Sequence, residues 1–246
     1  MDEQKFERAK EAVGKSDNLG LGIGTLKEGT LHAVVKHYIE DNINFHEVKV
    51  GRFVADIKRE NEIIEIQTRQ FSKLRKKLEC FLEMYQVTIV YPISHVKWLS
   101  WIDVESGEVS PKRKSPKKGS PYEIFFELYK IKDLLIHPSL SICIVLIDME
   151  EYKLLNGWSR DKKRGAYRKD RIPTQLIEEI NISCPQDYKQ FIPHTLNNSF
   201  TSKDFKKHTK LSLRSAQLAL NVLTYLSVVE RIGKKGNAYI YKISST

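Results

Sequence analysis

Cysteine is scarce in this chain, and its three cysteines, Cys80, Cys143 and Cys184, lie far apart without a CxxC pair. A disulfide framework or a structural zinc site needs closely paired cysteines, so neither is expected. The chain also lacks the run of about 20 apolar residues that a membrane helix requires. Its charged first residues are not followed by the apolar segment of a signal peptide. These absences predict a protein of the reducing cytoplasm that has no membrane partner.

Several common catalytic motifs are missing as well. There is no GxSxG nucleophile turn, no Walker loop and no GxGxxG. The glycines at positions 20, 22 and 24 follow no predicted strand, which argues against a nucleotide-binding loop. Seven histidines are present, but His32 and His37 are five residues apart instead of the four of a helical metal pair.

Basic residues are abundant. Lys and Arg number 41 against 31 Asp and Glu, which gives a formal net charge of +10 over 246 residues. With 41% hydrophobic residues, the chain can build a core in one large domain or two small ones. A basic surplus attracts polyanions, of which nucleic acid is the commonest, although a merely basic protein is the alternative.

Hydrophobic periodicity predicts alternating helices and strands, which is typical of an α/β fold. Expected helices are 30–40, with Thr30 as its cap, 71–85 and 122–135. Expected strands are 46–50, 52–58, 62–68, 87–93, which ends at a proline, and 141–149, with a hairpin over 97–111 that turns at Ser106–Gly107. Residues 181–190 lose periodicity, and this predicts two domains, 1–184 and 185–246.

Acidic residues interrupt the apolar strands at 52–68. Asp56 follows Phe53-Val54-Ala55, and Glu65 and Gln67 share one face of their strand because side chains alternate. A hairpin would bring Asp56 to the same place. Clustered charges must be paired or must bind metal. The two carboxylates and the backbone carbonyl of Ile66 suit Mg²⁺, with Mn²⁺ as the alternative ion. The plainer alternative is a solvent-facing hairpin with exposed acids.

Asp56, a spacer and then Glu65-Ile66-Gln67, preceded by a helix and followed by helix and strand, resembles the PD-(D/E)xK nuclease superfamily. The resemblance covers about residues 25–93 and implies a restriction-endonuclease-like mixed sheet flanked by helices. It implies that Asp56 and Glu65 hold metal and that Gln67 stands where lysine is usual. Gln cannot supply a positive charge or carry a proton. For the further acid that members often have near the first helix, the candidates are Glu28, then Glu40 and Glu47.

The C-terminal residues 187–246 contain ten Lys or Arg against three acids. A short helix after Thr201-Ser202, a longer helix capped by Ser212 and two strands joined at residues 234–237 resemble a winged helix, a small α+β domain. The resemblance implies base contacts from Arg214, Ser215, Gln217 and Asn221, and phosphate contacts from Lys206, Lys207, Lys210, Lys234 and Lys235. A winged helix used for protein contacts is the alternative.

Together these features predict a Mg²⁺-dependent DNA endonuclease that binds duplex DNA through its C-terminal domain. The alternative is a catalytically inactive nuclease-fold DNA-binding regulator or assembly protein, which Gln67 favours. RNA is a third substrate option, and a homodimer stays open because no dimer seam is visible. The basic runs at 112–118 and 160–171 either line a phosphate channel or are solvated loops.

Overall fold

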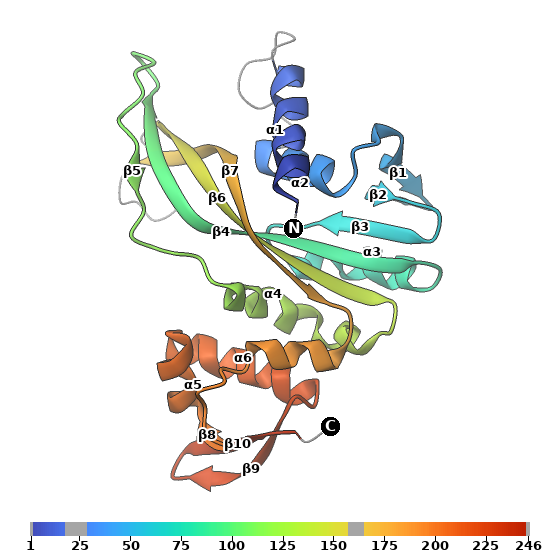
Figure 1. Cartoon of the computed structure of the whole chain (residues 1–246), viewed down its shortest axis with the longest axis vertical. Coiled ribbons are helices and arrows are strands. Elements are labelled where there is room, and N and C mark those ends of the chain that lie inside the picture. The colour runs from blue at the N-terminus through green and yellow to red at the C-terminus, as the bar shows by residue number, and fades with distance from the viewer. Residues whose placement is uncertain (1, 18–28, 157–164, 245–246) are drawn as a thin grey trace.

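The computed structural model of the chain describes residues 2–17, 29–156 and 165–244. It consists of a large mixed β-sheet with helices on both faces and a smaller sheet near the C-terminus (Figure 1). The large sheet has the order β1-β2-β3-β4-β6-β7, with β5 paired to β4. This arrangement confirms the predicted α/β class with a mixed sheet flanked by helices.

The strands of the large sheet begin with an antiparallel meander and continue with parallel neighbours. β1–β2 and β2–β3 are antiparallel, β3–β4 and β4–β6 are parallel, and β6–β7 is antiparallel. The parallel β3–β4 pair confirms the connection expected through the helix that follows β3. The bounds are β1 (His46–Val50), β2 (Phe53–Lys58), β3 (Glu62–Ile66), β4 (Gln86–Asp103), β5 (Arg113–Lys114), β6 (Leu140–Leu155) and β7 (Ala166–Ile182).

Two apolar layers hold helices against the faces of this sheet. On one face, α1 (Glu3–Asp17) and α2 (Thr30–Ile39) pack over a cluster that contains Ile64 and Ile66. On the other face, α3 (Phe71–Leu82) and α4 (Phe125–Leu128) cover a cluster that contains Ile63. The alternation of Ile63, Ile64 and Ile66 between the clusters follows from the two-residue period of a strand.

Strands β4, β6 and β7 are much longer than predicted and extend past α2 as a curved arm (Figure 1). The prediction that a strand ends near Pro92 is wrong, whereas the predicted hairpin over 97–111 is present, since Ile102 pairs antiparallel with Val109 and β4 pairs antiparallel with β5. β4 pairs with β6 from Val87 to Asp103 with one irregularity, so the register continues past Pro92. Proline lacks only the N–H and retains a φ near that of a strand, so extension is allowed. A tight turn follows β4, where Gly107 takes a φ of 74°.

Two predicted helix features need correction. The N-cap of α2 is Gly29, and Thr30 lies inside the helix, where its backbone N–H and its hydroxyl donate to the Asp170 carboxylate of β7. The helix expected over 122–135 is divided into the 3₁₀ segment η2 (Pro121–Ile124), α4 and the 3₁₀ segment η3 (Tyr129–Ile136). Ile131 departs from helical geometry, with φ −128° and ψ 22°.

The C-terminal module, residues 185–244, has the helix and strand order that the sequence predicts. It contains η4 (Pro185–Phe191), β8 (Ser199–Thr201), α5 (Ser202–Thr209), α6 (Leu213–Tyr225), β9 (Val229–Lys235) and β10 (Ala238–Ile243), and its sheet has the order β8-β10-β9. The Ser212 side chain caps α6, as expected, and the Thr201 side chain caps α5. Lys234 and Lys235 are the last residues of β9, so the turn itself is shorter than predicted.

The apolar core of the C-terminal module is continuous with that of the large sheet. Phe191 of η4 packs edge-on against Phe125 of α4, with ring centroids 5.1 Å apart, and Tyr122 contacts Phe205 of α5. Phe125, Phe191 and Phe205 belong to one buried cluster together with Leu220 of α6, and the partly buried Tyr122 packs against it. The described part of the chain contains no helix that is both long and apolar enough to span a membrane.

Candidate functional site

Asp56 of β2 and Glu65 of β3 lie where these two antiparallel strands diverge. Their ladder contains only the pairs Ile57–Ile64 and Lys58–Ile63. Beyond it, carboxylates take over as acceptors for backbone N–H groups. The Ile66 N–H donates to Asp56 Oδ2 at 2.7 Å, and the Asp56 N–H donates to Glu65 Oε1 at 3.4 Å. The predicted convergence of Asp56 and Glu65 is therefore present, built into the end of the β2–β3 pair.

Helix α2 contributes His32 to this pair. His32 Nε2 lies 3.0 Å from the Ile66 carbonyl oxygen and 3.4 Å from Asp56 Oδ2. Since a carbonyl oxygen only accepts, the hydrogen bond requires a proton on Nε2. His32 thus lies between two of the oxygens that the sequence assigns to a metal ion. The sequence does not indicate a role for His32, because no pair of its histidines has metal-ligand spacing.

Helix α3 contributes Lys77 from the other face. Lys77 Nζ donates to Glu65 Oε2 at 2.6 Å, and only 17% of the lysine side chain and 3% of the glutamate side chain are exposed. A buried carboxylate is costly unless it is paired. The expectation that metal must offset both acidic charges is therefore too simple, because the chain places His32 and Lys77 against them.

The pKa values of the two carboxyl groups are shifted in opposite directions. Burial and the negative charge of Asp56 raise the pKa of Glu65 to about 7. Burial also raises the pKa of Asp56, but the hydrogen bond and charge of His32 and the Ile66 N–H outweigh it. The pKa of Asp56 therefore lies below its ordinary value. Near neutral pH, Asp56 is ionised while Glu65 is poised to gain or lose a proton.

The donor atoms suit a hard cation, on the condition that His32 shifts or joins as a ligand. Asp56 Oδ2 and the Ile66 carbonyl oxygen already share one neighbour, His32 Nε2, and Glu65 is held next to the Asp56 backbone. Carboxylate and carbonyl oxygens are the ligands of Mg²⁺ and Mn²⁺, and imidazole is a softer ligand. Within the described ranges, no group of three or more His, Cys, Asp or Glu side chains is arranged to hold a metal ion.

The remaining predicted site residues lie elsewhere. Gln67 follows the end of β3, and its side-chain amide donates to the Arg69 carbonyl oxygen. Glu40 accepts from Arg59 Nε at 2.8 Å, and Glu47 pairs with Lys36 at 2.6 Å. No contact joins Glu40 or Glu47 to Asp56 in the part of the chain that the structure describes, so neither is brought to this pair. Glu28 lies outside the described residues.

Basic side chains surround a buried carboxylate on the arm formed by β4, β6 and β7. Glu151 is 3% exposed. Its oxygens lie 3.1 Å from Lys97 Nζ, 3.6 Å from Lys153 Nζ and 3.7 Å from Arg168 Nε. One negative charge is thus met by three positive ones, which leaves this part of the arm with a net positive charge.

Two further arginines, Arg171 and Arg69, add to this positive charge. Burial and the like charges of Arg168 and Arg69 lower the pKa of Arg171 to about 10. Arg69 comes two residues after Gln67. The C-terminal part of the predicted basic stretch 160–171 is therefore close enough to Arg69 to interact with it electrostatically, while residues 157–164 are outside the described residues. In the other basic run, Lys112 pairs with Glu150 and Lys117 with Glu123.

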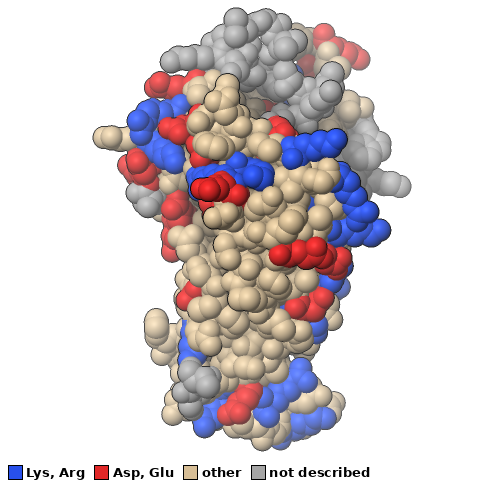
Figure 2. Space-filling view, turned by 90° about the vertical axis from the view of Figure 1, so that its right-hand side faces the viewer, with Lys and Arg blue, Asp and Glu red and all other residues tan. Residues whose placement is uncertain are grey.

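The residues predicted to contact DNA lie mostly on the surface of the C-terminal module. Arg214 and Gln217 of α6 are exposed, whereas Ser215 is half-buried and its N–H donates to the cap Ser212. Asn221 is also half-buried and accepts from Lys132 Nζ of η3 at 3.4 Å. The lysines at 206, 207, 210, 234 and 235 are all exposed. Figure 2 shows Lys and Arg side chains gathered at this end of the molecule.

Sequence comparison places the large sheet in a family. Residues 29–183 match the family described as Domain of unknown function (DUF8091). The chain belongs to this family. The DUF8091 domain extends from α2 to β7 and includes His32, Asp56, Glu65 and Lys77, while α1 and the C-terminal module lie outside it.

An uncharacterized protein of Treponema pallidum (strain Nichols) is 33% identical to this chain over 162 residues. The match covers 65% of this chain and 62% of that protein, so the chain spans less than two thirds of its relative. No solved structure matches the chain. Neither the name of the DUF8091 family nor that of the relative states an activity.

Proposed function

We propose that this DUF8091 protein is a divalent-metal-dependent nuclease of the PD-(D/E)xK type that hydrolyses phosphodiester bonds in DNA. The observation that carries the proposal is that Asp56 and Glu65 lie together where β2 and β3 diverge, joined by the hydrogen bonds from the Ile66 and Asp56 N–H groups, with Lys77 against Glu65. Its support includes the element order around the pair, a helix, a three-stranded meander, a helix and a parallel strand, which agrees with the resemblance.

In this proposal, Asp56, Glu65 and the Ile66 carbonyl hold the ion. The bound ion would supply charge stabilisation at the phosphate and a more acidic water. His32 now donates to the same oxygens, so it either turns aside or becomes a ligand through Nε2. If it becomes a ligand, its nitrogen shifts the preference from Mg²⁺ toward Mn²⁺. Ion binding also requires an ionised Glu65, so affinity rises as pH increases through about 7.

Lys77 supplies a positive charge that Gln67 cannot supply. The resemblance implies a lysine at position 67, where glutamine can neither carry a positive charge nor move a proton. Lys77 brings a positive charge to Glu65 from α3, within 2.6 Å. We assign to Lys77 the stabilisation of negative charge on the phosphate, and to Gln67 a supporting role at most, because its amide is engaged with Arg69. The cationic arm residues Lys97, Lys153, Arg168 and Arg171 would bind the DNA backbone.

A second candidate function is DNA binding without cleavage. It is favoured by the fact that His32 and Lys77 already pair with the two carboxyl groups without an ion. A protein of this kind would keep the fold and the basic surface and would need no metal. Both candidates predict DNA binding, so cleavage separates them.

The test is cleavage of single-stranded and of duplex circular DNA with Mg²⁺ or Mn²⁺ by the wild type, Asp56→Asn and Lys77→Met. We expect cleavage by the wild type, its loss in Asp56→Asn, and a fall of about a hundredfold or more in Lys77→Met because a charge that stabilises the reaction is removed. Glu47→Gln is the matched control, since it removes a distant acid. A wild type that binds DNA but cuts with neither ion would overturn the nuclease proposal in favour of the binding protein.

A further inference from the structure

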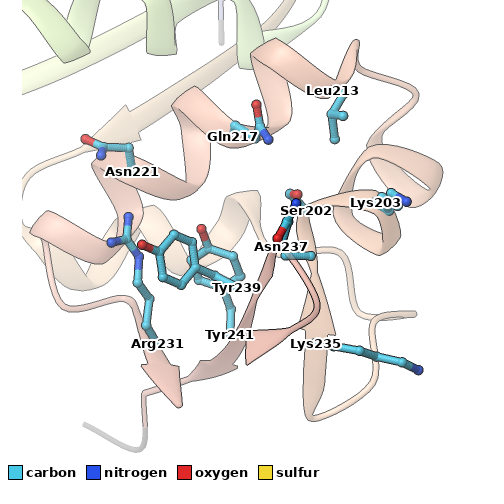
Figure 3. A pocket seen from close by; sticks show the side chains of 11 residues that line it. Ser202, Lys203, Leu213, Gln217, Asn221, Arg231, Lys235, Asn237, Tyr239 and Tyr241 are labelled. Carbon is cyan, nitrogen blue, oxygen red and sulfur yellow. The ribbon is translucent and has the colours of Figure 1, made fainter. Parts of the chain in front are cut away.

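The C-terminal module contains a cavity of about 460 Å³ between α6 and the β9–β10 hairpin (Figure 3). Gln217 and Asn221 line it from α6, and Arg231 and Tyr239 line it from the hairpin. In the close-up, Arg231 and the two tyrosines stand on the strands below α6, while Lys203 and Lys235 lie at the edge. A volume of this size falls in the range of small-ligand pockets.

The lining of this cavity is basic and contains no acid. Lys203, Arg231 and Lys235 supply positive charge, and none of the eleven residues that the structure places around the cavity is Asp or Glu. An anionic ligand is therefore the one that complements it electrostatically. This lining disfavours cationic ligands and favours an acidic or phosphorylated ligand.

Aromatic and guanidinium surfaces inside the cavity favour a ligand that carries a nucleic-acid base as well as a phosphate. The Arg231 guanidinium lies 4.3 Å from the ring centroid of Tyr239, and Tyr239 is 40% exposed. Aromatic rings and guanidinium planes are the surfaces on which unpaired bases stack. The amides of Gln217 and Asn221 offer both donors and acceptors to a base edge. Stacking surface, amides and cations are thus combined in one hollow.

The same geometry disfavours an intact duplex on α6. A helix recognises duplex DNA by entering the major groove, so the side chains that contact the bases must project from the protein surface. Here Gln217 and Asn221 line a hollow whose opposite wall is the hairpin. The C-terminal half of α6 is also covered by η3, where Lys132 donates to Asn221 and lies over the Tyr225 ring at 5.2 Å.

We propose that this cavity binds an unpaired segment of a nucleic-acid strand, with a base stacked against Tyr239 and Arg231 and the flanking phosphates near Lys203 and Lys235. This inference deepens the proposed nuclease function and rests on it, because that function identifies the nucleic acid as DNA. It makes the substrate a DNA with a single-stranded segment, such as an overhang or a junction. A 460 Å³ cavity holds a unit of mononucleotide size, so the contact is local.

The experiment measures fluorescence anisotropy of a labelled single-stranded DNA and of a duplex of equal length at one salt concentration. It uses the full chain with Asp56→Asn, so that cleavage plays no part in the readout. We expect the single strand to bind more tightly than the duplex. Tyr239→Ala should weaken single-strand binding by about tenfold or more, and Tyr239→Phe should retain it, because stacking needs only the ring.

Matched controls separate the cavity from general charge and from folding. Ile232→Ala changes an exposed residue of the same hairpin outside the cavity, and Lys242→Ala, at an exposed lysine of β10 outside the cavity, is the charge-matched control for Lys203→Ala. Only Lys203→Ala should weaken binding beyond the general charge effect. Equal or tighter duplex binding, or equal losses in Tyr239→Ala and Ile232→Ala, would overturn the inference. Failure of the nuclease proposal is separate, because it appears as absent cleavage in the wild type.

Discussion

At the scale of single residues, Asp56 and Glu65 are similar acids in different electrostatic surroundings. Asp56 accepts from a backbone N–H and lies beside His32, so its carboxylate is stabilised. Glu65 is more deeply buried and faces the charge of Asp56, which Lys77 only partly offsets. The pair thus combines an ionised carboxylate with an acid that titrates near neutrality, which is a pattern found at functional sites.

Replacing Glu65 should change how stability depends on pH. The pKa of Glu65 is about 7 in the folded state and 4.5 ordinarily. Between these values the folded state holds a proton that the unfolded chain has released. The contribution of Glu65 is therefore fully present below about pH 4.5 and is lost as pH rises through about 7. The loss amounts to about 3 kcal/mol at about 1.4 kcal/mol for each pKa unit.

Urea unfolding of the wild type and Glu65→Gln across that pH window provides the measurement. The neutral amide does not titrate, so Glu65→Gln should gain stability relative to the wild type as pH rises. Glu47→Gln, which alters a carboxylate whose side chain is 55% exposed, should follow the wild type. Parallel pH curves for the wild type and Glu65→Gln would show that Glu65 does not titrate in this window.

The sequence predicts the two acids but not their partners. Asp56 and Glu65 lie on adjacent strands, and alternation along a strand with a short connection brings them together. His32 and Lys77 come from helices on opposite faces of the sheet, and their approach depends on how each helix packs. Local spacing carries no information about such packing. For the same reason, the sequence could not show that Glu40 and Glu47 pair with Arg59 and Lys36.

At the scale of elements, helix α3 begins without a capping side chain of its own. Gln70, at its N-cap, takes a left-handed φ of 63° and makes no side-chain cap bond. Instead, the Phe71 N–H donates to Glu127 Oε2 of α4 at 2.7 Å. An anionic acceptor at a helix N-terminus satisfies a free N–H and interacts favourably with the helix dipole. Glu127 thereby fixes the start of the helix that carries Lys77.

Glu127→Ala should therefore destabilise the protein by about 1 to 3 kcal/mol, because it leaves a buried N–H without an acceptor. Urea unfolding monitored by circular dichroism measures this change. Glu123→Ala is the matched control, since Glu123 pairs with the exposed Lys117 near the same segment, and it should have little effect. Equal effects of the two substitutions would mean that the capping contact contributes nothing specific.

Elements whose ends are set by nearby residues are predicted more accurately than strands that are lengthened by pairing with distant strands. Thr201 and Ser212 cap α5 and α6 through contacts within three residues, and both helices begin where the sequence indicates. β4 and β6, in contrast, continue well past their apolar runs because each supplies the other with ladder partners. A restriction-endonuclease-like fold for the large sheet is a proposal, which rests on the order of its elements and on the Asp56–Glu65 pair.

At the scale of the whole molecule, the described structure has one continuous core where the sequence predicts two domains. The predicted boundary at residues 184 and 185 comes from a loss of periodicity and a change in charge. Periodicity cannot show that Phe191 packs against Phe125 or that Leu220 joins the same cluster. Removal of residues 185–246 would expose these aromatic surfaces to water.

We therefore expect the chain to unfold in one cooperative transition. Tryptophan fluorescence reports the large-sheet part, because Trp98, Trp101 and Trp158 all precede residue 185. Far-UV circular dichroism also reports the helices of the C-terminal module. The two urea midpoints should coincide, and a chain that ends at residue 184 should be unstable. Separate midpoints, or a stable truncated chain, would instead support two independent domains.

The metal site that we propose at Asp56 and Glu65 can be tested by calorimetric titration without any knowledge of the substrate. Mn²⁺ and then Mg²⁺ are titrated into the wild type, Asp56→Asn and the control Glu47→Gln, at a pH above the pKa of Glu65. We expect one saturable site in the wild type and in Glu47→Gln, and its loss in Asp56→Asn. An absence of binding to the wild type, or the same binding in Asp56→Asn, would contradict it.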